Sequence, residues 1–379
     1  MTSPTISVDN PFVRIRTDIS EEYAEDHDKP WVVGFSGGKD STLVAHLVVD
    51  HLLTLPRSER SRSVHIVAND TLVESPLVIG HINETLAEIS VAANAFDLPI
   101  NVATTSPVPD HTFWVNLIGR GYPSPNQSFR WCTDRMKIQP TSRYIREQAS
   151  LADEVILLLG VRRNESATRS AVVKKYDNGE RLNRHNDLYK CLVFRPIVEL
   201  DVDDVWEFLA KNPPPWGGTH HRLIKLYRDA GGGECPVVTS KEDVPSCGTS
   251  SSRFGCWTCT VVEKDKSLAG FVEAGFENFL PLLSFRDWLV SIRNEPDRRL
   301  ARRRDGKFTI SKKGVHVPGP FNMATRQEIL DRVKSLEKET NRRFISDVEL
   351  KIIRLLWVED ILQSADRSVK KQKLASTGR

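Results

Sequence analysis

The sequence predicts an α/β protein built on a doubly wound, mainly parallel sheet, with a cysteine-rich segment and a helical region after it. Three observations support this fold class. Short apolar segments alternate with segments of helical apolar spacing through the first 230 residues. A Gly/Ser-rich turn follows the first apolar segment, and the alternation stops near Gly231. We expect an N-terminal arm (1–28), a nucleotide domain (29–230), a cysteine-rich segment (231–262) and a helical, basic C-terminal region (263–379).

Each element follows from its local pattern. Residues 1–28 are polar and lack sustained periodicity, so we expect an arm there rather than a domain. The apolar segment 153–161 is of the kind buried on both faces of a parallel sheet. The tail from Arg367 is basic and is expected to fray. The spacing predicts strands over 31–35, 63–70, 98–105 and 153–161, and helices over 41–55, 76–96, 141–152, 201–212, 325–340 and 345–363.

Composition excludes several classes of protein. Hydrophobic residues make up 39% of the 379 residues, too many for a disordered chain. The net charge of +3 excludes a polycation, although residues 293–313 hold nine Lys and Arg against three acidic residues. The start of the chain lacks the pattern of a secretory signal, and no apolar run reaches the length of a membrane span. We therefore expect a cytoplasmic protein with no membrane partner.

A candidate phosphate loop lies at the end of the first predicted strand. Residues Ser36-Gly37-Gly38-Lys39-Asp40-Ser41-Thr42 separate that strand from an amphipathic helix. Glycines let the backbone approach a phosphate closely, and the N–H groups at a helix start bind anions. The spacing does not fit a Walker A loop, because Asp40 follows the lysine. A tight turn before a well-capped helix would be the alternative.

Six cysteines without a secretory signal indicate reduced thiols. Four of them could ligate a [4Fe–4S] cluster or a structural Zn²⁺, and sequence alone would favour zinc; these are Cys235, Cys247, Cys256 and Cys259. Cys132 stands apart, flanked by Arg130, Arg135 and Lys137, and nearby cations lower the pKa of a thiol. It could relay sulfur, ligate the cluster or be structural. Cys191 is expected to be a core residue.

From the loop onward the sequence resembles the PP-loop ATP pyrophosphatases, in the branch of the phosphoadenylyl-sulfate reductases. The resemblance covers roughly residues 30–262. Within that branch it is most similar to the DNA phosphorothioation proteins DndC and SspD, through RWCTDRMK and the later CG…RFGCWTC. The Glu-Cys-Gly-x-x-His type of motif of the assimilatory reductases is absent. The matching segments are SGGKDST at 36–42, Asp70-Thr71 with Glu74, Arg130–Thr133 with Lys137, Gly160–Ser166 with Arg169, and Arg195–Ile197 leading to Asp204–Trp206.

The resemblance implies a PP-loop (adenine nucleotide α-hydrolase-like) domain and an ATP pyrophosphatase and sulfurtransferase that acts on DNA. It implies ATP, Mg²⁺ and a [4Fe–4S] cluster as cofactors, with a cysteine desulfurase, other phosphorothioation proteins and DNA as partners. Lys39 and the loop amides would neutralise pyrophosphate as it leaves. Expected catalytic residues are Lys39, Asp40 and Cys132; ATP-binding residues are Ser36, Gly37, Gly38, Lys39, Asp40, Ser41, Thr42 and Asp70; anion-binding residues are Arg130, Lys137, Arg162, Arg163 and Arg169.

Three functions compete. The first is ATP-dependent insertion of sulfur into the DNA backbone, with a phosphate oxygen activated as AMP and pyrophosphate form. The second is a sulfonucleotide reductase or a PP-loop enzyme that thiolates tRNA. The third is a non-catalytic DNA-binding adaptor with a structural metal. The basic residues 293–313 could contact a nucleic-acid backbone or form a solvated helix face.

Overall fold

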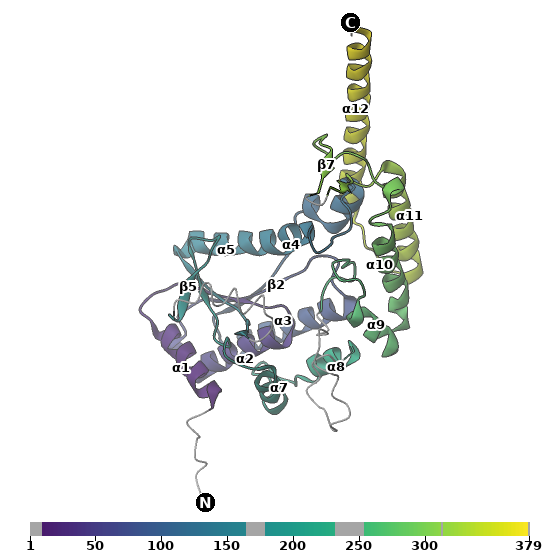
Figure 1. Ribbon diagram of the computed structural model, residues 1–379. Helices are drawn as coiled ribbons and strands as arrows, with labels where there is room; N and C mark the ends of the chain where they lie inside the picture. Colours follow the sequence, from purple (N-terminus) through teal and green to yellow (C-terminus); the bar gives the residue numbers. More distant parts are fainter. Residues whose placement is uncertain (1–9, 164–178, 232–253, 312–313, 378–379) are drawn as a thin grey trace, which may run out of the picture. The chain divides into compact units, whose positions relative to one another are not determined.

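The computed structural model describes residues 10–163, 179–231, 254–311 and 314–377. The chain divides into two compact units. Unit 1 contains residues 1–70, 75–105 and 140–254, and unit 2 contains residues 71–74, 106–139 and 255–379. Unit 2 is therefore discontinuous in sequence, because two of its segments come from within the first 139 residues. The elements of both units are labelled in Figure 1.

A six-stranded sheet in the order β3-β2-β1-β4-β6-β5 forms the centre of unit 1. All neighbours pair in parallel except β5 and β6, which are antiparallel. The order places β1 in the middle, with Val33 opposite Ile66 on one side and Leu158 on the other. The strands are β1 (Trp31–Gly34), β2 (Val64–Asn69), β3 (Ile100–Thr105), β4 (Val155–Leu158), β5 (Leu182–Arg184) and β6 (Cys191–Phe194). The predicted doubly wound, mainly parallel sheet is confirmed.

Helices cover both faces of this sheet (Figure 1). Helix α5 packs Ile145 and Ala149 against Val32 and Val155 on one face, while α2, α3 and α7 lie on the other. All four residues of β4 are buried, which fits its position inside the sheet. The helices of unit 1 are α1 (Pro11–Ala24), α2 (Lys39–Thr54), η1 (Arg57–Glu59), α3 (Pro76–Phe96), α5 (Gln139–Ala152), α7 (Val202–Lys211) and α8 (His221–Asp229).

Both ends of the chain contain more helix than the sequence predicted. Residues 11–24 form the helix α1, which begins after Asn10, whose side chain accepts a hydrogen bond from the N–H of Phe12. Its buried face includes only Ile15, Ile19 and Tyr23 among apolar residues, too short a stripe to stand out among the charges around it. At the other end, the helix expected to end near residue 363 continues to Thr377, so the tail is helical rather than frayed.

Helices dominate unit 2. They surround a cluster of aromatic side chains in which Trp257 contacts Trp114, Phe285 and Phe344. A two-stranded antiparallel hairpin joins β7 (Thr309–Ile310) to β8 (His316–Val317). The helices are η2 (Pro109–His111), η3 (Val115–Gly119), α4 (Trp131–Thr133), η4 (Asp134–Ile138), α9 (Lys266–Glu273), η7 (Glu277–Phe279), α10 (Leu280–Ile292), η8 (Pro296–Arg298), α11 (Met323–Thr340) and α12 (Asp347–Thr377). Within the described part of the chain, no helix is both long and apolar enough to cross a bilayer.

Candidate functional site

The predicted phosphate loop lies between the carboxyl end of β1 and the start of α2, in unit 1. Gly37 has φ of +71°, and a Cβ there would lie 2.5 Å from Cγ1 of Ile82, so a side chain at this position is excluded. The Oγ of Ser41 accepts from the N–H of Ser36 at 3.2 Å and donates to the carbonyl of Gly38 at 3.0 Å. These bonds fix a tight turn whose backbone leads into the N-terminus of a 16-residue helix. The geometry is that of an anion site.

The charged residues of this loop are linked to the strand β4. Nε of the buried Arg162 donates to Oδ1 of Asp40 at 2.6 Å, and Nζ of Lys39 lies 3.4 Å from Oδ2 of the same carboxylate. A Cβ on Gly160 would lie 2.7 Å from the backbone carbonyl of Asp40. Gly160 therefore lets the chain after β4 pass directly under the first turn of α2. The two cations and one carboxylate leave a net charge of +1, which favours an anionic ligand.

Two residues beside the loop were not predicted. The backbone N–H of Lys39 donates to the hydroxyl of Tyr227 at 3.2 Å, so a residue of α8 covers the helix start. The ring of His81, from α3, lies 3.5 Å from a Cβ built on Gly37. Burial, with Arg222 nearby, lowers the pKa of His81 to about 4, which keeps the ring neutral at neutral pH. Neither residue belongs to a local motif, so their contact with the loop arises only from the fold.

The remaining predicted nucleotide and anion residues lie in different surroundings. Asp70 directly follows β2 at the carboxyl edge of the sheet, and its N–H donates to the carbonyl of Thr105 at 2.8 Å. Arg163 pairs with Glu199 at 2.6 Å. Arg169 lies outside the described residues. The anion-binding roles of these side chains stay predictions.

The second candidate site contains thiols and belongs entirely to unit 2. Cys256 and Cys259 occupy one turn, closed by a 2.9 Å hydrogen bond from the N–H of Cys259 to the carbonyl of Cys256. Sγ of Cys256 shares a 3.2 Å hydrogen bond with the hydroxyl of Thr71. Cys132, from α4, is close enough to Cys259 that this neighbour contributes to raising the pKa of Cys132. The fold thus brings together cysteines separated by more than a hundred residues in sequence.

A carboxylate and a lysine accompany these thiols. Oε1 of Glu74 accepts from Sγ of Cys256 at 3.6 Å and lies 3.3 Å from Nζ of Lys137. The negative charge that Cys256 carries when ionised raises the pKa of Lys137, as do Glu74 and Cys132. Lys137 therefore stays protonated beside the thiols. The sequence predicted Lys137 as an anion-binding residue. Thr71 and Glu74 were noted only as part of the resemblance to the family, with no predicted role.

One of the sequence-based expectations for Cys132 is wrong. Its pKa is raised, not lowered, because burial and the neighbouring Cys259 outweigh Lys137. The two flanking arginines contact other residues. Arg130 is exposed and donates to Gln127, and the guanidinium of Arg135 lies 5.5 Å from the ring centre of Tyr122. Of the three cations near Cys132 in sequence, Lys137 is the one that acts on its thiol.

Two arginines hold the cysteine turn in place: Arg286 of α10 and Arg293, which follows the last residue of that helix. Arg286 is fully buried, and its guanidinium donates to the carbonyls of Cys259 at 2.8 Å and Glu263 at 2.6 Å, and to that of Val262. Arg293 donates to the carbonyl of Thr260 at 2.6 Å. Each guanidinium satisfies carbonyl groups that would otherwise be buried without partners. The backbone on the C-terminal side of Cys259 is consequently fixed.

The thiols of this site are suitable ligands for iron, although two of the four predicted cysteine ligands are not among the described residues. Cys235 and Cys247 lie outside the described residues, so the four-cysteine ligand set stays a prediction. Among the described residues, no three Cys, His, Asp or Glu side chains are placed to hold one metal ion. The irons of a [4Fe–4S] cluster occupy separate corners, so its thiolate ligands lie further apart than the ligands of a single ion. Cys132, Cys256 and Cys259 fit that donor chemistry. Cys191 is buried within β6, as expected of a core residue.

A comparison with sequence models of protein families identifies the family. The sequence model of the phosphoadenosine phosphosulfate reductase domain matches residues 30–262. An uncharacterized protein of Methanocaldococcus jannaschii is 25% identical over 194 residues, which are 51% of this chain and 34% of that protein. The chain thus spans about a third of the length of this curated relative.

Solved structures overlap only weakly with the chain. They include a phosphoadenylyl-sulfate reductase of Candida auris in a phosphate complex (12% identity, 56% of this chain and 89% of that one, TM-score 0.32). A U34-tRNA thiolase of Methanococcus maripaludis with its [4Fe–4S] cluster gives 12% identity over 58% and 74% of the two chains, with a TM-score of 0.33. The NH3-dependent NAD synthetase of Campylobacter jejuni gives 14% over 75% and 95%, with a TM-score of 0.31. At these scores the superpositions carry no weight for function.

Proposed function

Because this chain belongs to the phosphoadenosine phosphosulfate reductase family, we propose that it is an ATP pyrophosphatase that inserts sulfur into the DNA backbone. The observation that carries the proposal is the thiol site of unit 2, in which Cys132 lies beside the Cys256–Cys259 turn. A chain that combines a phosphate loop with a site for sulfur chemistry suits ATP-dependent sulfur transfer. DNA as the acceptor is supported by the motifs RWCTDRMK and RFGCWTC, which resemble those of phosphorothioation proteins.

In the first step, an oxygen of a DNA phosphate attacks the α-phosphorus of ATP. A bond forms between that oxygen and the phosphorus, the bond to the α–β bridging oxygen breaks, and pyrophosphate leaves. Lys39 and the first N–H groups of α2 stabilise the negative charge that develops on pyrophosphate. Asp40 holds Lys39 in place and is itself fixed by Arg162. Asp70 is the carboxylate proposed to face the nucleotide or the Mg²⁺ that accompanies ATP.

In the second step, hydrosulfide attacks the activated DNA phosphorus. The P–S bond forms as the bond to the AMP oxygen breaks, AMP leaves, and the proton of hydrosulfide passes to solvent. The exchange involves no net oxidation or reduction. A cysteine desulfurase, proposed as the donor, delivers sulfur as a persulfide, and an external thiol must supply two electrons to release it as hydrosulfide.

The thiols of unit 2 are proposed to hold a [4Fe–4S] cluster. Cys132, Cys256 and Cys259 would ligate it, with Cys235 and Cys247 as further candidates. Such a cluster would supply thiolate-bound iron, a metal with high affinity for sulfide. Lys137 keeps a positive charge beside these thiols, which favours the approach of an anionic sulfur species or DNA phosphate.

The test uses anaerobically purified protein with ATP, Mg²⁺, sodium sulfide and duplex DNA. We expect AMP and pyrophosphate, and phosphorothioate dinucleotides after nuclease digestion, detected by mass spectrometry. Lys39→Ala should lower pyrophosphate release by about 10²-fold or more, whereas Lys211→Ala, an exposed lysine of α7, should not. Sulfur found in a nucleotide product or in tRNA would favour the reductase or thiolase alternatives, and ADP as the main product would contradict the proposal.

A further inference from the structure

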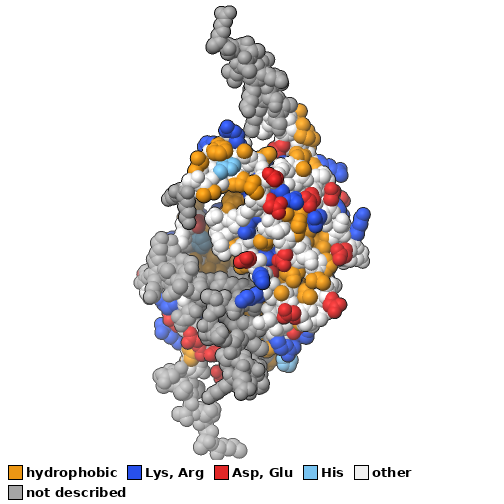
Figure 2. All heavy atoms as spheres, turned by 45° about the vertical axis from the view of Figure 1, so that its right-hand side comes forward, with side chains coloured by type: hydrophobic (Ala, Val, Ile, Leu, Met, Phe, Trp, Pro, Cys, Tyr) orange, Lys and Arg blue, Asp and Glu red, His pale blue; other side chains and the backbone are white. Residues whose placement is uncertain are grey.

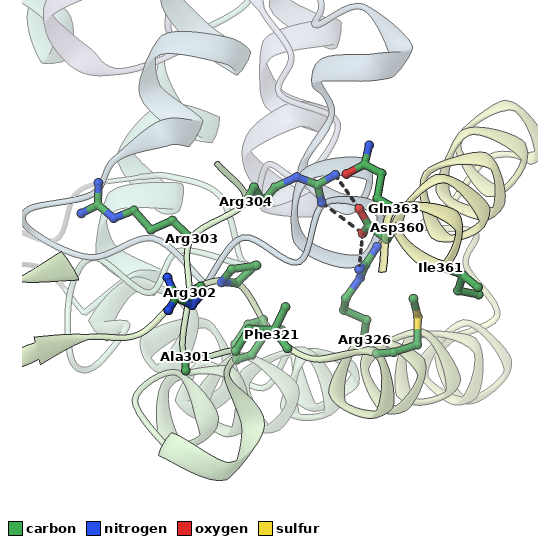
Figure 3. A pocket seen from close by; sticks show the side chains of 12 residues that line it. Ala301, Arg302, Arg303, Arg304, Phe321, Arg326, Asp360, Ile361 and Gln363 are labelled. Carbon is green, nitrogen blue, oxygen red and sulfur yellow. Dashed lines mark hydrogen bonds and ion pairs between the residues drawn. The ribbon is translucent and has the colours of Figure 1, made fainter. Parts of the chain in front are cut away.

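Unit 2 contains a hollow of about 470 Å³ with an unusual lining of arginines. The chain segment from Leu300 to Arg304 forms one wall, and the start of α11 and the middle of α12 form the others. Figure 3 shows Asp360 between Arg304 and Arg326, while the side chain of Arg303 extends away from that cluster. Four guanidinium groups and one carboxylate line this space, a net charge of +3.

The four arginines divide into two pairs. Arg326 is buried, donates to Asp360 at 2.7 Å and also binds the carbonyl of Ile118, so it belongs to the framework. Arg304 donates to both oxygens of Asp360, at 2.8 and 3.2 Å. Arg302 and Arg303 are exposed and contact no carboxylate among the described residues. The unneutralised charge is therefore concentrated in these two side chains at the rim.

The rest of the basic segment supports this division. Arg298 pairs with Glu295 and Glu328, and Arg299 donates to the carbonyls of Gly319 and Pro318. Arg298 and Arg299 therefore already bind partners within the fold, so their guanidinium groups are not available to a ligand. Among the described residues, neither Arg302 nor Arg303 pairs with a carboxylate, and the guanidinium of Arg302 bonds to the carbonyl of Gly306 in its own turn.

A β-ribbon stands at the same rim. The ring of His316, in β8, bonds to the carbonyl of Ala301 at 2.8 Å, and the N–H of Arg303 bonds to the carbonyl of Lys307 just before β7. These contacts hold the backbone of the rim, from which the exposed side chains of Arg302 and Arg303 extend. Figure 2 shows Lys and Arg side chains next to hydrophobic ones in the upper part of the face it draws.

We propose that this rim binds duplex DNA, the acceptor of the proposed function, with Arg302 and Arg303 on backbone phosphates. Guanidinium groups bind phosphate through paired hydrogen bonds, and a concave basic surface concentrates an anionic ligand. The buried pair of Arg326 and Asp360 fixes the floor of the hollow, so the exposed arginines project from a rigid frame. This binding surface is separate from the thiol site and does not depend on sulfur chemistry.

The test measures binding of the full chain to a fluorescent DNA duplex about two helical turns long, without ATP or sulfide, across a range of salt concentrations. The Arg302→Ala/Arg303→Ala variant should lower the slope of log affinity against log salt by about 2, since each phosphate contact contributes about 0.9. Affinity at low salt should fall about tenfold or more. The matched control, Arg342→Ala/Arg354→Ala, removes two exposed arginines of the same unit outside the hollow.

The Arg302→Lys/Arg303→Lys variant keeps the charge and should recover most of the slope. Circular dichroism of each variant should be that of the original chain, because the substituted side chains are exposed. The proposal is overturned if the double alanine variant keeps the original slope, or if the control lowers the slope as much. Because binding is measured without ATP, failure here is distinguishable from a failure of pyrophosphate release or sulfur insertion.

Discussion

The phosphate loop of unit 1 and the thiol site of unit 2 are built in different ways. The loop is a local structure: residues 36–42 join one strand to one helix, and glycine geometry at Gly37 specifies the turn. The thiol site is assembled from three distant segments, with Thr71 and Glu74 from the first, Cys132 from the second and the Cys256–Cys259 turn from the third. Local sequence is enough to specify the first site, whereas the second depends on the packing of unit 2.

This difference predicts which substitutions each site tolerates. The loop should be most sensitive to added volume, because backbone approaches backbone with no side chain between them. The thiol site should be most sensitive to the loss of Arg286 and Arg293, because they hold its backbone from outside. Substitutions in one unit should therefore affect one activity and spare the other.

The largest effect is expected from Arg286→Ala. The change removes a buried guanidinium and leaves the carbonyls of Cys259, Val262 and Glu263 without their donor. We expect a loss of about 3 kcal/mol or more in the free energy of unfolding of unit 2, together with lost iron. Denaturant unfolding and iron content measure these effects. Arg342→Ala, an exposed arginine of the same unit, should change neither, and full iron content in Arg286→Ala would show that the turn needs no such support.

A smaller effect is expected from Gly160→Ala. The added Cβ would lie 2.7 Å from the backbone of Asp40, so the first turn of α2 must shift, at a cost of about 1–3 kcal/mol. Pyrophosphate release should fall while iron content stays unchanged. Gly80→Ala is the matched control, since a Cβ there meets nothing within 4 Å in the helix α3. It should leave the chain as stable as before or slightly more stable; equal behaviour of the two variants would rule out the close approach.

The smallest effect concerns acid. The pKa of His81 is about 4 in the folded chain against an ordinary value of 6.5, because burial and Arg222 disfavour its charged form. As the pH falls below 6.5, the His81 ring becomes protonated in the unfolded chain but stays neutral in the folded chain. The unfolded state is thereby favoured, and the folded chain loses stability between pH 6.5 and 4. Between pH 7 and 5.5, the free energy of unfolding of His81→Leu should fall by about 1 kcal/mol less than that of the original chain. Denaturant unfolding at both pH values measures this difference. An unchanged loss would mean that His81 is not buried neutral.

The sequence predicted the sheet and the loop because both depend on local patterns. Alternating apolar segments located β1, β2, β3 and β4 but not β6, the fifth strand that pairs in parallel, and Gly37 and Lys39 marked the loop. Tyr227 and His81 could not be predicted, because α8 and α3 bring them to the loop only after the sheet has formed. For Cys132 the sequence left relay, cluster ligand and structural thiol open, because residue spacing does not show that it lies near Cys259 in the fold. Arg286 was missed because an arginine on an apolar helix carries no mark of what it binds.

The central claim is that Cys132 belongs to one iron–sulfur site with Cys256 and Cys259, and its most direct test is the iron content of a Cys132→Ala variant. The protein is purified anaerobically, and iron and acid-labile sulfide are measured per chain beside Cys191→Ala, another largely buried thiol, which lies in the core of unit 1. The account predicts about four irons in the original chain and in Cys191→Ala, and loss of most of the iron in Cys132→Ala, with pyrophosphate release retained. Full iron and sulfide in Cys132→Ala, or zinc in place of iron in the original chain, would contradict it.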